Sequence, residues 1–179
     1  MPFNREKFKL LVRYIAWKAG RRDWFGATKL NKVLWFADAR SFVLRGEPIT
    51  GATYIREKYG PVPRQIMPIR GELEREGYIR VFEEGSLIRV VADAKPDMST
   101  FTKDELQTID YWINYIDKEH TAGTISDASH DYAWDIAPMG EELPLYAILA
   151  NRIRDPSDQE SEKFRTIAKA RGGLQGADY

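Results

Sequence analysis

Cysteine is absent from this chain of 179 residues. Its absence excludes disulfide bonds, thiolate metal sites and cysteine nucleophiles, and it agrees with a reducing compartment. The sequence also lacks any run near the ~20 apolar residues that a membrane-spanning helix needs. Its first residues include charged side chains and do not form the uninterrupted apolar region of a signal peptide. We therefore expect a cytoplasmic protein without a membrane partner.

An excess of either charge is also missing, because 27 Lys and Arg residues balance 27 Asp and Glu residues. Nucleic-acid-binding proteins usually carry a basic excess or a basic stripe. Here only a local cluster could serve, and its residues are Arg13, Lys18, Arg21 and Arg22, with Trp17 and Trp24 among them. A helix followed by a hairpin over residues 61–91 resembles a recognition helix and wing, although its glutamates would repel phosphates. A nucleic-acid-binding transcriptional regulator is thus the alternative function, and nucleic acid is not the partner we expect.

Motifs of catalysis are lacking too: there is no glycine-rich phosphate loop, no G-x-S-x-G and no H-E-x-x-H. The best candidate cluster is His130 with Asp127, Asp131 and Asp135. A lone histidine lacks the oriented partners of a catalytic constellation. We therefore interpret His130 as a structural residue packed under Trp134. The sequence predicts no enzyme, no catalytic residue, no cofactor and no metal.

Hydrophobic periodicity is what the sequence does contain. Apolar residues recur at helical spacing over residues 4–19, with Asn4 as the expected N-cap. The helix over residues 28–45, with Thr28 as its cap, is apolar around most of its circumference, with Leu44 on its main apolar face. Only two narrow polar strips remain on it, Asn31 with Asp38 and Lys29 with Arg40. Such a helix is contacted from several sides, so we place it at the centre.

Shorter patterns follow the central helix. Residues 52–56 have strand character, and residues 61–76 read as a helix in which Pro68 causes a kink or marks the true start. Residues 78–91 predict a β-hairpin that turns at Gly85.

The second half of the chain contains a clear helix signal. A capping box formed by Thr102 and Glu105 begins a helix that runs to about His120. A short helix from Thr124 or Ser126 should carry His130 and Trp134. These elements predict an α+β fold, mainly helical, with a central helix surrounded by other helices and a small β element built from residues 52–56 and the 78–91 hairpin.

Composition divides the chain near residue 153. Residues 1–153 contain the periodic segments, whereas residues 154–179 are mostly polar. We expect one domain over residues 1–153 and a C-terminal extension over residues 154–179, with a charged helix near residues 155–170 and a loose end.

Ordered sequence blocks resemble the Panacea-domain (SocA-like) antitoxin family. The blocks are TKLNKVLWFAD at residues 28–38, PITGATY at 48–54, YGPVP at 59–63, EGYI at 76–79 and TISDASH at 124–130, followed by Trp134. The resemblance covers roughly residues 5–150. No block is decisive by itself, but their order and spacing together are fairly specific to this family.

The resemblance implies an antitoxin that neutralises a cognate protein toxin, the product of a neighbouring gene, by direct binding. It also implies a possible role as an adaptor, because the SocA member delivers its toxin to the ClpXP protease. The matching positions, either partner contacts or residues that hold the fold, are Lys29, Asn31, Trp35, Asp38, Tyr59, His130 and Trp134.

Overall fold

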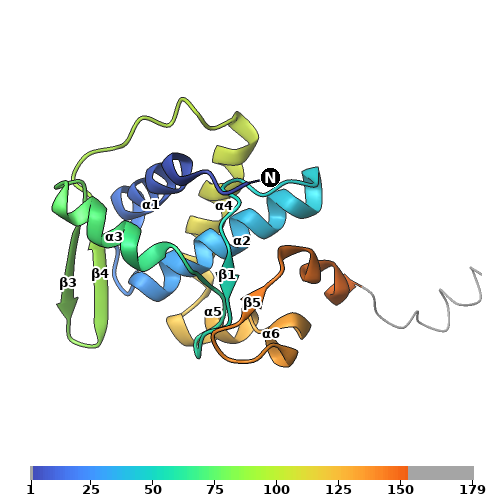
Figure 1. Cartoon of the computed structure of the whole chain (residues 1–179). Helices are drawn as coiled ribbons and strands as arrows, with labels where there is room; N and C mark the ends of the chain where they lie inside the picture. The colour runs from blue at the N-terminus through green and yellow to red at the C-terminus, as the bar shows by residue number, and fades with distance from the viewer. Residues whose placement is uncertain (1, 153–179) are drawn as a thin grey trace, which may run out of the picture.

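The computed structural model describes residues 2–152, which form a mainly helical α+β fold (Figure 1). Its helices are α1 (Arg5–Ala19), α2 (Ala27–Arg45), α3 (Ile66–Arg75), α4 (Lys103–Glu119), α5 (Ala122–Ala128), α6 (Tyr132–Ile136) and the 3-10 helix η1 (Leu145–Arg152). Its strands are β1 (Tyr54–Ile55), β2 (Val62–Pro63), β3 (Arg80–Glu84), β4 (Leu87–Val91) and β5 (Glu142–Leu143). The predicted fold class is confirmed. The helix expected near residues 155–170 lies outside the described residues.

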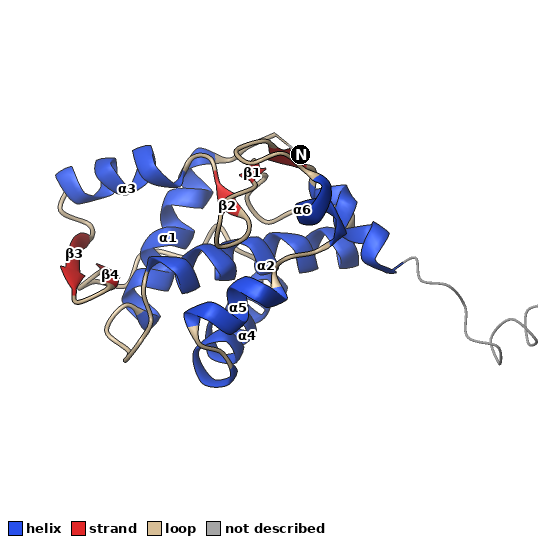
Figure 2. Ribbon diagram, turned by 90° about the horizontal axis from the view of Figure 1, so that it is seen from below, coloured by secondary structure: helices blue, strands red, loops and turns tan. Residues whose placement is uncertain are grey.

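Helix α2 is the central helix, as its sequence predicts. It contacts α1, α4, α5, η1 and strands β2 and β4 (Figures 1 and 2). The prediction that Thr28 caps it is wrong, because the N-cap is Gly26 and no side chain caps the helix. A Cβ atom at Gly26 would lie 2.4 Å from Cδ1 of Leu87. The hairpin therefore packs against the start of α2 so closely that a capping side chain has no room.

The core forms where α1, α2 and α4 meet. Its fully buried side chains include Phe8, Leu11, Val12, Ile15, Val33, Leu34, Ile109, Ile113 and Ile116. The cap of α1 by Asn4 and the capping box of α4 are both confirmed. One apolar expectation fails, because Leu44 is 65% exposed. It lies in the last turn of α2, beside a cavity against α4 instead of in the core.

Ion pairs attach α1 to its neighbours on two sides. The ammonium of Lys7 lies 2.7 Å from the Glu105 carboxylate of α4, and that of Lys9 lies 2.8 Å from the Glu72 carboxylate of α3. These lysines lie on the polar side of an amphipathic helix, so their charges meet carboxylates at the edge of the core. They join α1 to both neighbouring helices.

The β structure differs from the prediction of one small element. Strand β1 pairs antiparallel with β2 and with β5, and β3 pairs only with β4 in a separate hairpin. The predicted strand over residues 52–56 shortens to two residues. Strands of two residues, such as β2 and β5, are too short to show the alternation that identifies a strand in sequence. The hairpin itself is confirmed, with Gly85 at φ +60°.

Pro68 lies at the beginning of α3. Of the two predictions for this segment, a kink at Pro68 or a helix start near it, the second is confirmed. The helix starts at Ile66, so Pro68 lies in the first turn, where backbone N–H groups have no partner within the helix. Its missing N–H therefore costs nothing. Residues 61–65 are not helical, because Val62 and Pro63 form β2 instead.

The short helix expected to carry both His130 and Trp134 is two helices. The side chain of Thr121 accepts a hydrogen bond from the Thr124 amide at 3.1 Å and starts α5. The side chain of Asp131 accepts one from the Trp134 amide at 2.9 Å and starts α6. His130 therefore lies in the link between two separately capped helices. The prediction that one helix contains both residues is wrong for this reason.

Candidate functional site

Two of the seven family-motif positions lie in the core. The ring of Trp35 packs edge-on against Tyr54, with centroids 4.9 Å apart. The fully buried carboxylate of Asp38 accepts hydrogen bonds from the Thr50 amide, the Thr50 hydroxyl and the Tyr54 hydroxyl at 2.9, 2.6 and 2.9 Å. Burial raises the pKa of Asp38, and its donors oppose that shift. These two residues join α2 to the segment before and within β1.

A buried lysine, Lys32, lies in the same helix and was not among the predicted positions. It is 1% exposed, and its ammonium donates a hydrogen bond to the Pro61 carbonyl at 3.1 Å. Burial lowers the pKa of Lys32 to about 7. The adjacent Gly60 has φ +89°, and a Cβ there would lie 2.1 Å from the Ser129 hydroxyl oxygen. Lys32, Gly60 and Ser129 thus pack α2, the loop before β2 and the end of α5 together.

The later motif block forms a stacked pair. The rings of His130 and Trp134 are nearly parallel, with centroids 3.6 Å apart. The indole N–H of Trp134 donates to the Glu57 carbonyl at 3.1 Å, and the Arg56 guanidinium lies 4.2 Å from its ring. Burial, and then the charge of Lys32, lower the pKa of His130. This environment favours a neutral imidazole that packs under the indole.

Ligands for a metal are not gathered here: within residues 2–152, no three His, Cys, Asp or Glu side chains lie together so that they could hold an ion. Nor does this part of the chain contain a helix with the length and hydropathy needed to cross a membrane.

Another motif residue, Asn31, also lies on α2. Its side-chain oxygen is buried and has no hydrogen-bond partner among the described residues.

Two motif residues, Lys29 and Tyr59, line one cavity of about 580 Å³. We call it the Trp24 cavity. It lies between the first turn of α2, the loop before it, the β3–β4 hairpin and the start of α5. Its lining includes Asp23, Trp24, Thr28, Lys29, Tyr59, Ile88, Asp117 and His120. The sequence did not predict it, because four segments that are distant in the sequence form it.

Large exposed side chains surround this cavity. Trp24, Tyr59 and Ile88 are 76%, 59% and 42% exposed. The backbone of Trp24 has φ +59°, a left-handed conformation that costs a residue with a side chain about 1–2 kcal/mol. Tryptophan and tyrosine are enriched among the residues that dominate protein interfaces. A strained backbone that presents an exposed tryptophan therefore points to a binding surface.

A family model described as antitoxin SocA-like, Panacea domain, matches residues 30–135, more than half of the chain. The chain belongs to this family. The resemblance predicted from the sequence blocks is confirmed. No curated protein and no solved structure matches the chain.

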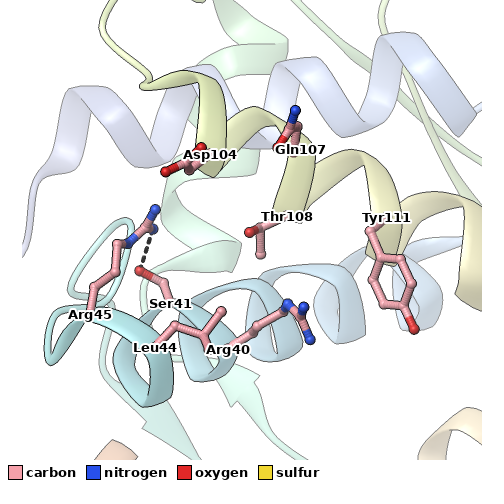
Figure 3. Close-up of a pocket in the computed structure, with 8 residues that line it drawn as sticks. All are labelled: Arg40, Ser41, Leu44, Arg45, Asp104, Gln107, Thr108 and Tyr111. Atoms are coloured by element: carbon pink, nitrogen blue, oxygen red, sulfur yellow. Dashed lines mark hydrogen bonds between the residues drawn. The ribbon is translucent and has the colours of Figure 1, made fainter.

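A second surface of this Panacea domain lies between the end of α2 and the start of α4. Figure 3 shows side chains of both helices around a cavity of about 320 Å³. Arg45 donates to the Ser41 hydroxyl at 2.6 Å, and the Arg40 guanidinium lies 5.5 Å from the Tyr111 ring. None of the seven motif positions lines this cavity, whereas two of them line the Trp24 cavity.

The basic cluster near α1 is largely paired with acids in the Panacea-domain structure. Lys18 lies 2.6 Å from the Asp110 carboxylate, Arg22 lies 2.9 Å from that of Asp117, and Arg21 pairs with Asp93. The fourth member, Arg13, has its guanidinium 3.8 Å from the Tyr78 ring. These four cations therefore already interact with carboxylates or an aromatic ring of the same protein.

Proposed function

We propose that this Panacea-domain protein is a non-enzymatic antitoxin that binds a protein toxin through the Trp24 cavity and its exposed rim. The observation that carries the proposal is the strained, 76% exposed Trp24. It lies beside Tyr59 and buried Lys29 at a cavity next to the central helix. An aromatic centre with a charged rim is the usual composition of a specific protein interface.

The nucleic-acid alternative is less well supported by the same geometry. Three cations of the basic cluster are already paired with carboxylates. Strand β3 ends with Glu83 and Glu84 next to the turn of the hairpin, and these carboxylates would repel phosphates if the hairpin acted as a wing. A DNA-binding regulator would need those charges rearranged.

The test is co-expression of this protein with the product of its neighbouring gene, followed by growth rescue and affinity measurement by calorimetry. Trp24→Ala and Tyr59→Ala should each weaken the complex by about 30-fold or more, the effect of removing an interface hot spot. Tyr146→Ala is the matched control, because Tyr146 is 67% exposed on η1, away from the cavity.

The outcomes separate the parts of the proposal. If co-expression gives no growth rescue and no complex, the antitoxin function is overturned. Steeply salt-dependent DNA binding would then favour the transcriptional regulator. A tight complex that tolerates both alanine variants would overturn the Trp24 cavity as the contact surface. The toxin's half-life in cells with and without a ClpXP-type protease separates simple blockade from delivery for degradation.

A further inference from the structure

The first turn of α2 borders the Trp24 cavity. Gly26 supplies no capping side chain, and no acidic residue lies in the first turn. Ala27, Thr28 and Lys29, the first three residues of the helix, all line the cavity. Backbone N–H groups at a helix start have no partners within the helix and carry a partial positive charge. This end of the central helix therefore favours an anion.

A buried ammonium lies at the same place. Lys29 is 2% exposed, and its ammonium makes one hydrogen bond, of 3.4 Å, to the Asp117 carbonyl. Within residues 2–152, no carboxylate forms a salt bridge with it, and the nearby Asp117 carboxylate is paired with Arg22 at 2.9 Å. An ammonium has three N–H donors, and a buried charge without a partner is costly. Lys29 thus lacks the carboxylate that its position calls for.

We propose that the Trp24 cavity receives one aspartate or glutamate side chain of the toxin, whose carboxylate pairs with Lys29 and caps the first turn of α2. The exposed rings of Trp24 and Tyr59 pack against the toxin residues around that acid. This inference rests on the proposed function and gives the chemistry of the partner.

A protein carboxylate fits this cavity better than a nucleic-acid phosphate. Asp23 lines the same cavity and has no ion pair among the described residues, so it opposes any anion that enters. A single side-chain carboxylate adds one negative charge near Asp23, whereas duplex DNA carries a negative charge about every 1.7 Å along its axis and would be repelled more strongly. The exposed apolar surface of Trp24 and Ile88 also suits a protein partner.

The experiment measures the affinity of the purified neighbouring-gene product for three variants. Lys29→Met keeps the length of the stem and removes the charge, so the complex should weaken roughly 10- to 100-fold. Asp23→Asn removes the repulsion and should strengthen the complex about 2- to 5-fold. Lys103→Met removes an exposed lysine at the start of α4 and is the control for the loss of one positive charge.

Folding is checked separately by thermal unfolding. Because Lys29→Met removes a buried charge, its melting temperature should equal or exceed that of the wild type. A wild-type affinity for Lys29→Met, or a weaker complex with Asp23→Asn, would overturn the inference while the antitoxin function stands.

If the neighbouring-gene product does not bind at all, the proposed function fails and the cavity is tested with short probes. These are acetylated, amidated Leu-Glu-Leu and Leu-Gln-Leu peptides and a duplex oligonucleotide, each followed by the NMR signal of the Trp24 indole. Movement of that signal by the glutamate peptide alone, lost in Lys29→Met, supports the carboxylate site. Equal movement by both peptides, no movement, or movement only by the oligonucleotide overturns it.

Discussion

The buried ammonium of Lys32 should make the stability of this protein depend on pH in a defined window. Burial lowers the pKa of Lys32 from 10.5 to about 7 in the folded protein. Between these two values the unfolded chain binds the proton and the folded protein releases it. Stability therefore rises as the pH rises from about 7 towards 10.5.

The size of the effect follows from the same two values. Each pH unit within the window changes the free energy of unfolding by at most about 1.4 kcal/mol per proton. Because Lys32 is still half-protonated near pH 7, the gain between about pH 7 and pH 9 is about 2 kcal/mol. Lys32→Met cannot titrate, so the difference in unfolding free energy between the wild type and this variant should change by that amount.

Urea unfolding followed by circular dichroism, at several pH values in this range, measures that difference. Taking the difference cancels every group that titrates alike in both proteins. His130, which touches the same cluster, has a lowered pKa and titrates below the window. Lys103→Met is the control for the loss of one charge at an exposed site. Parallel pH profiles for the wild type and Lys32→Met would refute the reasoning, because the ammonium would then not be desolvated.

Three further substitutions test other parts of the structure. Trp24→Gly should raise the unfolding free energy by about 1 kcal/mol, because glycine relieves the left-handed backbone, and it should also weaken toxin binding. A thermal melt measures the stability and calorimetry measures the binding. Unchanged stability would contradict the backbone strain at Trp24. Asp38→Ala should lower the unfolding free energy by roughly 3–5 kcal/mol, because buried donors of Thr50 and Tyr54 lose their acceptor, while Asp38→Asn should cost less. Equal losses in the two urea titrations would contradict that role. Gly60→Ala should lower the unfolding free energy by more than about 2 kcal/mol, because the added Cβ would clash with Ser129. Gly46→Ala is the matched control. Gly46 has φ +77° and open space around it, so this variant should lose only the conformational cost of about 1 kcal/mol.

Local patterns were sufficient to predict the long helices of this fold. The periodicity of α1, α2 and α4 is a property of each segment, so it predicts them without tertiary information. The side-chain caps at Asn4 and Thr102 are equally local. The break at His130 was also locally encoded, since the side chains of Thr121 and Asp131 each accept a hydrogen bond from the backbone amide three residues ahead.

Tertiary packing decided what the local patterns could not. The sequence places Lys29 and Asp38 on narrow polar strips of α2, yet both side chains are buried because other segments cover them, and Lys32 is buried as well. The Trp24 cavity joins the loop before α2, the hairpin and the α4–α5 junction, which no local pattern connects. The 76% exposure of Trp24 is likewise not visible in any local pattern, because a large aromatic residue is by default expected in the core.

The residues that hold the central helix and the residues that form the exposed rim of the Trp24 cavity are different ones. Asp38, Lys32 and Trp134 connect α2 to the β1–β2 region and to α5 and α6, and all lie within the family match over residues 30–135. The Trp24 cavity is lined by residues just before that match, such as Trp24 and Lys29, and by residues within it, such as Tyr59 and Ile88. The exposed side chains of Trp24, Tyr59 and Ile88 take no part in the hydrogen bonds of the buried cluster. The rim can therefore be changed to fit another partner while the interactions that hold the central helix stay the same.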